Sequence, residues 1–179
     1  FSILLKDKSK PEDFEGFYEK MKEAYKIIFE KVGIGHVTYM TFASGGTFAK
    51  YSHEFQTVTG AGEDTIYVHH GKKLAVNKEV LTDLVLKDLG VSRSDLKEEA
   101  AVEVGNIFSL GTRFSEALGL MYKDAEGKSR FAHSLNNTAL ATPRILVPLV
   151  ENYQQPDGSI KVPDVLRMYV GKEKILPKN

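Results

Sequence analysis

Apolar residues recur at helical spacing through residues 11–32 of the chain. They are Phe14, Phe17, Tyr18, Met21, Tyr25, Ile28, Phe29 and Val32. Such a stripe predicts an amphipathic helix that lies on a hydrophobic core. Ser9 and Glu12 have the spacing of a capping box, and Gly33 supplies a stop signal. We interpret the aromatic stripe as core packing rather than as a cofactor site.

Alternation of apolar and polar residues, together with β-forming residue types, predicts a strand over 36–42. It leads into a turn at Ala43–Thr47, whose two glycines would let the backbone approach a ligand closely. The pattern further predicts strands at 64–68, 72–76, 101–109, 130–135 and 138–141, and helices at 78–89, about 94–100, 113–119 and 143–155. This order lacks a regular βαβ rhythm, so we expect an α+β domain with a largely antiparallel sheet flanked by helices.

The helix over 78–89 has an Asn cap at Asn77 and a glycine stop at Gly90. The strands at 64–68 and 72–76 form a hairpin around His69 and His70. Two adjacent histidines could suggest a metal, but without a third ligand we interpret them as turn residues.

The last predicted helix carries an arginine in its first turn. Thr142 can cap this helix, and Pro143 suits its first position because its missing N–H costs nothing there. Arg144 would then lie beside free backbone amides at the positive end of the helix dipole, which suits a phosphate. Spacing alone favours an ordinary capped helix with a surface arginine. Pro148 should bend the helix near Leu146 or Val147.

Composition permits many functions and excludes a few. The chain of 179 residues has 24 basic and 24 acidic residues, so no overall field attracts nucleic acid. It contains no cysteine, which excludes disulfides, thiolate zinc sites and cysteine nucleophiles. No apolar run approaches membrane-spanning length, and we expect a cytoplasmic protein. Because the sequence begins at Phe1 rather than at methionine, we expect an N-terminal portion to be missing.

Residues 128–176 contain several specific pieces in order. These are the strand HSLNNT, the arginine-containing helix, ENYQQ, the turn DGSI and the close VPDVLRMYV. This stretch closely resembles the third signature motif and C-terminal tail of seryl-tRNA synthetases, which are class II aminoacyl-tRNA synthetases. The resemblance implies that Arg144 binds the ATP phosphates and that Asn136 and Thr138 line the serine pocket. The family usually has a Gly-Ser pair where this chain has Asn137–Thr138, which is a departure within that pocket.

The preceding part of the chain carries different signatures. The most specific are SHEFQ at 52–56, GED at 62–64, and AVEVGNIFSLGTRFSEALGLMYKDAEGK at 101–128. With them, residues 1–128 resemble prolyl-tRNA synthetase between its second and third motifs. The resemblance implies that His53 and Glu54 contact the amino acid. That family commonly has histidine at the position of Asn106 and glutamine at that of Ser109, and these departures affect substrate contacts rather than the fold.

Both resemblances imply the class II catalytic fold and one chemistry, the ATP-dependent activation of an amino acid and its transfer to tRNA. Glu103 corresponds to the acidic residue of class II enzymes that helps to hold Mg²⁺ and ATP, and a carboxylate oxygen suits Mg²⁺. Without the resemblance it would be a solvent-facing strand residue. Thr112 and Arg113 follow at a turn and could face the same ATP cleft, although Arg113 could equally be a surface residue that opens the next helix.

The two resemblances disagree about the amino acid. The prolyl-like part covers more residues and favours proline slightly, whereas the seryl-like part is the alternative. The join between them falls within the charged turn at 124–130, so the chain is a partial or chimeric class II catalytic domain. It spans 1–179, with a small α/β insertion at about 65–100. The family implies a homodimer.

The first and second class II motifs are not visible in the sequence. The second supplies an arginine for the α-phosphate, so we expect the chain on its own to bind ATP weakly and to activate an amino acid poorly. A non-catalytic class II-like binding module and a fragment without an independent role are therefore further alternatives.

Overall fold

The computed structural model describes residues 2–4, 11–44 and 51–178. A seven-stranded sheet forms its centre, with the strand order β1-β9-β6-β3-β2-β5-β4. Its strands are β1 (Ser2–Leu4), β2 (Thr38–Ser44), β3 (Tyr51–Val58), β4 (Asp64–His69), β5 (Leu74–Asn77), β6 (Lys97–Gly111) and β9 (Ser134–Thr138). All pairings are antiparallel except that of β2 with β5. The expected α+β class with an antiparallel-rich sheet is confirmed.

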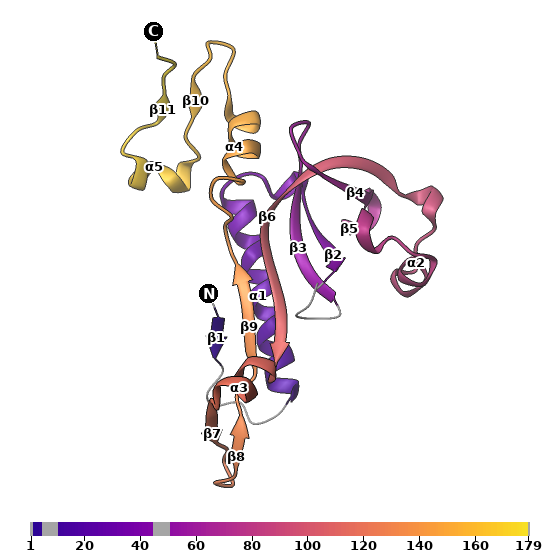
Figure 1. The fold of residues 1–179 in the computed structure, drawn as a ribbon. Coiled ribbons are helices and arrows are strands. Elements are labelled where there is room, and N and C mark those ends of the chain that lie inside the picture. The colour runs from indigo at the N-terminus through magenta and orange to yellow at the C-terminus, as the bar shows by residue number, and fades with distance from the viewer. Residues whose placement is uncertain (1, 5–10, 45–50, 179) are drawn as a thin grey trace.

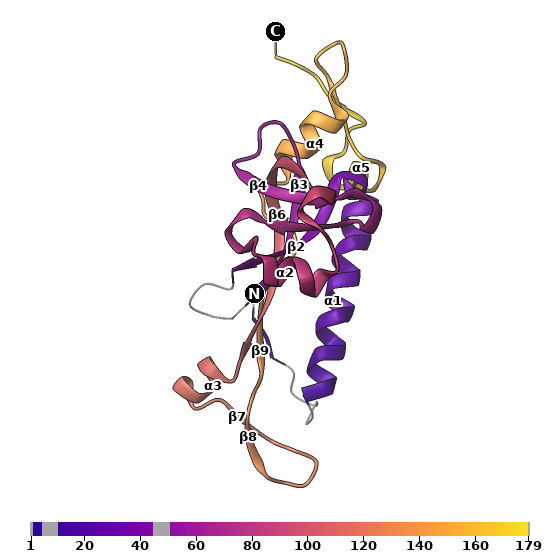
Figure 2. The same ribbon diagram turned by 90° about the vertical axis from the view of Figure 1, so that its right-hand side faces the viewer.

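One long helix, α1 (Pro11–Lys31), runs along one side of the sheet (Figure 1; Figure 2). The predicted stripe faces the sheet: Tyr25 and Phe29 are buried against Phe55 of β3, with ring centroids 5.4 and 5.2 Å apart. The helix ends before Gly33, whose φ of +83° suits glycine. A side chain there would also collide with the Tyr153 ring. Ser9 and most of the Ala43–Thr47 turn lie outside the described residues.

The long strand β6 pairs with β4 over 97–101, with β3 over 101–107 and with β9 over 106–111. The expected helix at 94–100 is therefore wrong. Only Arg93–Asp95 form a single 3₁₀ turn, and the chain then enters β6 because pairing with β4 satisfies its backbone. Strand β3 was missed by the hydrophobic pattern. It is held between β2 and β6 over 53–57.

Shorter helices connect the strands and mostly follow the expected pattern. The β4–β5 hairpin is confirmed, and His69 Nδ1 accepts a hydrogen bond from the Lys72 amide in its turn. The helix expected over 78–89 divides into a 3₁₀ turn (Lys78–Val80) capped by Asn77 and α2 (Asp83–Leu89) capped by Thr82. Gly90 ends α2 with φ +63°, and α3 (Arg113–Leu118) is present.

The last third of the chain forms small units at both ends of the sheet (Figure 1). At one end β7 (Met121–Lys123) and β8 (Ser129–Phe131) form a hairpin. At the other lie α4 (Leu146–Tyr153), β10 (Ile160–Lys161), α5 (Asp164–Val170) and β11 (Lys174–Ile175). Residues 139–141 are not a strand as expected, because β9 ends at Thr138. No helix in the described ranges is both long and apolar enough to cross a bilayer.

The start of α4 also differs from the expectation. Residues 142–145 form a turn, and the helix begins at Leu146, so Thr142 does not cap it. The Ala141 amide donates to the Val104 carbonyl of β6 at 2.7 Å, which holds the preceding segment against the sheet and delays the helix. Pro148 consequently lies in the first turn of α4, where a missing N–H is tolerated. The reason for the predicted bend near Leu146 or Val147 is therefore absent.

Candidate functional site

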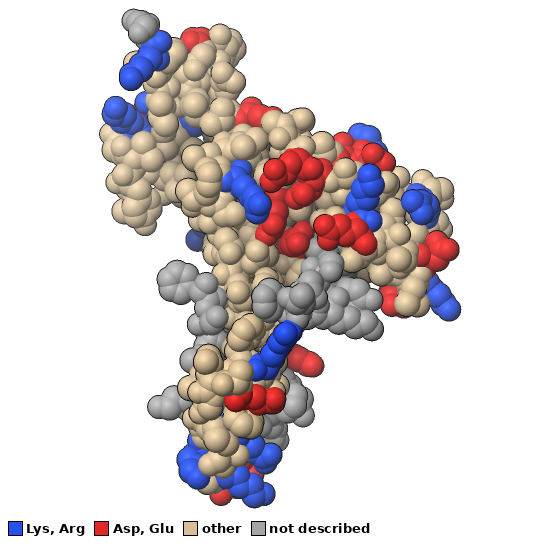
Figure 3. Space-filling model, viewed as in Figure 1, with Lys and Arg blue, Asp and Glu red and all other residues tan. Residues whose placement is uncertain are grey.

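Polar and charged side chains gather on the face of the sheet opposite α1. Strand alternation points Phe55 toward α1, so its neighbours Glu54 and Gln56 face the other way. Glu103 and Asn106 of β6 face this side too, because the Asn106 Nδ2 atom donates to Glu103 Oε1 at 2.7 Å. Figure 3 shows acidic side chains gathered over β3, β4 and β6 beside a basic one. We call Glu54, Gln56, Asp64, Asn77, Glu103, Asn106 and Arg144 the polar cluster.

A strand irregularity makes this arrangement possible. Residues three apart on a regular strand point to opposite faces, yet Glu103 and Asn106 are in contact. The register shifts between Phe55 and Gln56: Phe55 pairs with Gly105, whereas Gln56 pairs with Glu103. The extra residue, Val104, is a bulge that returns both polar side chains to the same face.

Arg144 reaches the polar cluster from the turn before α4. Its Nη1 atom donates to Glu103 Oε2 at 3.1 Å, and its Nε atom lies 3.7 Å from Glu63 Oε1. The Arg144 side chain is 47% exposed, whereas that of Glu103 is only 19% exposed. A half-exposed guanidinium beside a more buried carboxylate can exchange this partner for an incoming phosphate.

The expected phosphate site at the N-terminus of the last helix needs correction. The amides of Leu146 and Val147 donate to the carbonyls of Pro143 and Arg144, at 2.9 and 3.2 Å. They are therefore engaged within the turn, and Arg144 lies ahead of the helix rather than in its first turn. Any phosphate contact here depends on the guanidinium and not on the helix dipole.

Two contacts hold α4, and with it the Arg144 turn, against the body of the domain. Thr59 Oγ1 in the β3–β4 turn donates to Glu151 Oε2 at 2.5 Å. Tyr153 Oη donates to the Val32 carbonyl at the end of α1, at 3.1 Å. Glu151 and Tyr153 both belong to the ENYQQ stretch. This motif therefore positions the turn that carries Arg144.

The carboxylates at the other side of the cluster come from β3 and β4. Gln56 Nε2 donates to Glu54 Oε2 at 3.1 Å and to Asp64 Oδ2 at 2.9 Å. Asn77 Nδ2 lies 3.4 Å from the same oxygen of Glu54. Burial raises the pKa of Glu54, the hydrogen bond from Gln56 opposes this, and the nearby charge of Glu103 adds to the rise. A cation placed here would relieve the repulsion between these carboxylates.

The residues expected from the sequence are thus only partly brought together. Glu54, Glu103 and Arg144 lie in the cluster. Thr138 pairs with Asn106 across β9 and β6, and Asn136 lies two residues along the same face of β9. Thr112 and Arg113 are at the end of β6 and the start of α3, about 20 Å along the chain from Asn106. There Thr112 donates to Glu116.

His53 lies on the opposite face of β3. Its Nδ1 atom is 2.7 Å from the hydroxyl of Tyr18 on α1, and the two rings are 5.5 Å apart. The same hydroxyl donates to the Ile107 carbonyl at 2.9 Å. The structure therefore places His53 in the packing between α1 and the sheet and does not bring it to Glu54.

The partly buried position of His53 predicts a specific pH dependence of stability. Burial, reinforced by Lys22, lowers the pKa of this imidazole from 6.5 to about 4. Below pH 6.5 the unfolded chain takes up a proton that the folded chain refuses, so the free energy of unfolding falls as the pH decreases toward 4. Because the imidazole is only partly buried and solvent screens part of the effect, we expect a loss of about 1–2 kcal/mol between pH 7 and pH 5. Urea titrations of the wild type and of His53→Gln measure it, and equal pH dependence in both would contradict the prediction.

Sequence reasoning gave no site role to Gln56, Asp64 or Asn77, and it treated Asn106 only as a departure from the prolyl pattern; these four residues complete the cluster. The signal was present in part, because SHEFQ alternates polar residues with the core residue Phe55. Asp64 and Asn77 join the polar cluster because β4 and β5 pair with other strands of the sheet. No local sequence pattern predicts these pairings.

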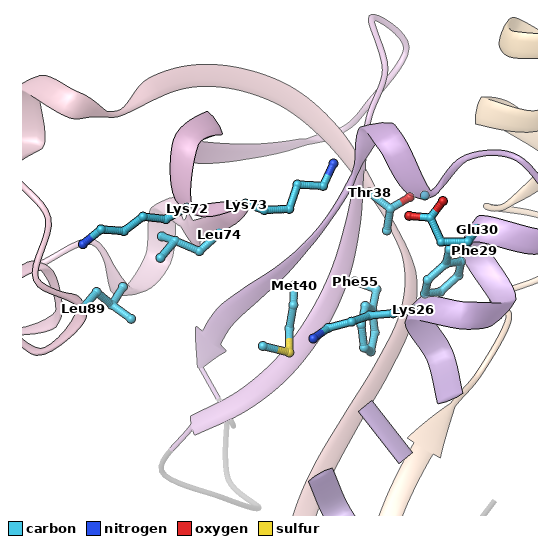
Figure 4. Close-up of a pocket in the computed structure, with 11 residues that line it drawn as sticks. Lys26, Phe29, Glu30, Thr38, Met40, Phe55, Lys72, Lys73, Leu74 and Leu89 are labelled. Carbon is cyan, nitrogen blue, oxygen red and sulfur yellow. The ribbon is translucent and has the colours of Figure 1, made fainter. Parts of the chain in front are cut away.

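A pocket on the α1 side of the sheet is separate from this cluster. It has a volume of about 350 Å³ and lies between α1, β2 and the β4–β5 hairpin (Figure 4). Lys26, Met40, Lys72, Leu74 and Leu89 are among its lining residues. Because Phe29 and Phe55 also line it, it lies behind the sheet as seen from Glu54.

With this geometry in place, the comparisons with known proteins decide the family. Residues 7–153 match the model of the tRNA synthetase class II core domain (G, H, P, S and T). The chain belongs to this family. Similar proteins include the serine–tRNA ligase of Deinococcus radiodurans, 52% identical over 67 residues, which are 37% of this chain and 16% of that protein. The serine–tRNA ligase of Chlamydia pneumoniae is 37% identical over 130 residues, which are 63% of this chain and 30% of that protein.

Two solved structures share the class II synthetase fold of the chain. One is the seryl-tRNA synthetase of Pyrococcus horikoshii in complex with ATP, with a TM-score of 0.63 and 19% identity over 99% of this chain and 32% of that one. The other is the cytoplasmic serine–tRNA ligase of Naegleria fowleri in complex with AMP, with a TM-score of 0.64 and 19% identity over 99% of this chain and 30% of that one. The chain thus matches less than a third of the length of these relatives, and they favour the seryl alternative over proline.

Proposed function

We propose that this class II synthetase core contributes to the ATP-dependent activation of serine. In this reaction a carboxylate oxygen of serine attacks the α-phosphorus of ATP. The new O–P bond forms as the bond to pyrophosphate breaks, and seryl adenylate results. The carrying observation is the contact of Arg144 with Glu103 on the face of the sheet that also holds Glu54 and Asp64. An arginine whose chemistry suits phosphate and carboxylates whose chemistry suits an ammonium group thus lie on one surface, which supports the proposal.

Each group has a role that its chemistry supports. Arg144 presents a planar fork of donors that matches phosphate oxygens and neutralises their charge. Glu54 and Asp64 suit the α-ammonium group of the amino acid, because they are neighbouring carboxylates joined by the Gln56 amide. Asn136 and Thr138 offer hydrogen-bonding side chains for the serine hydroxyl, and such contacts discriminate strongly against substrates that lack it.

Glu103 could supply one carboxylate ligand to a Mg²⁺ ion bound with ATP. The structure contains no group of three or more acidic, histidine or cysteine side chains arranged for a metal within its described ranges. Mg²⁺ in nucleotide sites commonly uses only one or two carboxylates together with phosphates and waters. Glu103 would supply such a carboxylate oxygen, and the ion would reduce the negative charge on the phosphates.

Transfer to tRNA, homodimer formation and a cytoplasmic location belong to the proposal for the whole protein. The similar serine–tRNA ligases support transfer to tRNA, and the cytoplasmic enzyme among the solved structures supports the location, whereas homodimer formation rests on the family resemblance alone. The chain matches 16% and 30% of the two ligases named above. The roles suggested for Thr112, Arg113 and His53 receive no support from their positions, so our proposal does not use them.

A comparison of two adenylate analogues tests the choice of amino acid. We expect seryl-sulfamoyl adenosine at 100 times its Kd to raise the Tm by about 5–10 °C. Prolyl-sulfamoyl adenosine at the same concentration should raise the Tm clearly less, because it keeps the adenosine and sulfamoyl groups but its ring cannot satisfy the hydroxyl-binding groups. Stabilisation by the prolyl analogue alone would contradict serine, and stabilisation by neither would favour a non-catalytic module.

A further inference from the structure

Gln56 occupies an unusual position within the polar cluster. Its side chain is completely buried, with 0% exposure, although it belongs to a polar residue on the face opposite α1. It connects Glu54 on β3 with Asp64 on β4, through distances of 3.1 and 2.9 Å from its Nε2 atom. These two strands are not neighbours in the sheet, so Gln56 spans from one to the other.

The chemistry of the two partners determines which way the amide points. Ionised carboxylates only accept hydrogen bonds, so both N–H groups of the amide must face them. The Oε1 atom is then left inside the protein without a hydrogen-bond partner among the residues that the structure describes. A buried carbonyl without a partner is unfavourable. The two hydrogen bonds to the carboxylates therefore determine the orientation of the Gln56 amide.

Holding these carboxylates together is itself unfavourable without a donor between them. Among the described residues, Glu103 on β6 adds its charge to that of Glu54. Arg144 contacts Glu103 and approaches Glu63 in the β3–β4 turn. The one cation of the cluster is thus directed at Glu103 and Glu63 and not at Glu54. Asn77 adds only a neutral donor at 3.4 Å.

We propose that Gln56 is a positioning residue, which holds the carboxylates of Glu54 and Asp64 side by side so that both meet one ammonium group of the substrate. This inference rests on the proposed function for the identity of the cation. Gln56 does not touch the substrate in this account. It acts by fixing the two acceptors before the ligand arrives, which reduces the cost of ordering them on binding.

The test compares two ligands that differ only in the ammonium group. They are seryl-sulfamoyl adenosine and 3-hydroxypropionyl-sulfamoyl adenosine, which lacks the amine. We expect Gln56→Met to weaken the first about tenfold and the second less than twofold, by isothermal titration calorimetry. The control is Ser94→Met, at an exposed residue of the Arg93–Asp95 turn, and it should change neither affinity. Equal losses for both ligands would mean a merely structural role and would overturn the inference.

A second measurement, which does not use the Met variant, keeps the inference testable if that variant does not fold. We expect both Nε2 protons of Gln56 to exchange slowly with solvent in NMR spectra. Glu54→Ala and Asp64→Ala should each shift a different one of these two protons. Fast exchange of both, or no shift in either variant, would overturn the inference.

These outcomes separate the inference from the proposed function. A wild type that binds neither analogue contradicts the proposed function, while the amide protons still decide the position of Gln56. A wild type that prefers the ammonium ligand, with the same preference in Gln56→Met, overturns the inference and leaves the proposed function intact.

Discussion

Arg144→Ala should lower the affinity of the chain for ATP by about 10- to 100-fold. A charge-assisted hydrogen bond contributes about 1.5–3 kcal/mol, and the change removes at least one of them. It also leaves Glu103 and Glu63 uncompensated where the triphosphate would approach, which adds repulsion. Isothermal titration calorimetry with ATP measures the effect directly.

Two further variants make this result specific. Arg144→Lys keeps the charge but loses the planar fork, so its affinity should lie between those of the wild type and the alanine variant. Arg167→Ala is the matched control, because this arginine contacts Asp164 and Glu173 in and after α5. An unchanged affinity in Arg144→Ala would favour a non-catalytic class II-like module over an ATP-binding core.

Phe55→Ala should destabilise the fold by about 3–5 kcal/mol. The ring is 1% exposed and lies between Tyr25 and Phe29 of α1, so its removal leaves a cavity at the junction of helix and sheet. The loss should also disturb ligand binding, because Glu54 and Gln56 flank this residue on β3. Urea unfolding followed by circular dichroism measures the change.

The control for this prediction is Leu118→Ala. That side chain is 78% exposed at the end of α3, and its truncation should change the free energy of unfolding by less than about 0.5 kcal/mol. A similar small loss in Phe55→Ala would mean that α1 is not anchored to the sheet through β3.

Local patterns predicted the elements whose structure depends on nearby residues. The stripe of α1, the glycine stops at Gly33 and Gly90 and the β4–β5 hairpin all follow from spacing and turn chemistry. The class II fold followed from long specific motifs rather than from periodicity. These elements have in common that their signals are contained within a short window of sequence.

The remaining features depend on pairing between distant segments. β6 begins at Lys97 because it pairs with β4, and α4 begins late because Ala141 is bonded to Val104. The bulge at Val104 brings Glu103 and Asn106 to one face, against the simple alternation of a strand. Sequence reasoning therefore found Glu54, Glu103 and Arg144 but neither the amide that joins two carboxylates nor the side of the sheet on which His53 lies.

Mapping the bound adenylate analogue by NMR tests the central claim, that the polar cluster opposite α1 is the binding surface. With seryl-sulfamoyl adenosine we expect the largest shift changes at the amides of Glu54, Gln56, Glu103, Asn106 and Arg144. The alternative binding site is the pocket on the α1 side of the sheet. Changes concentrated at Met40, Leu74 and Leu89, with the polar cluster unaffected, would contradict the account.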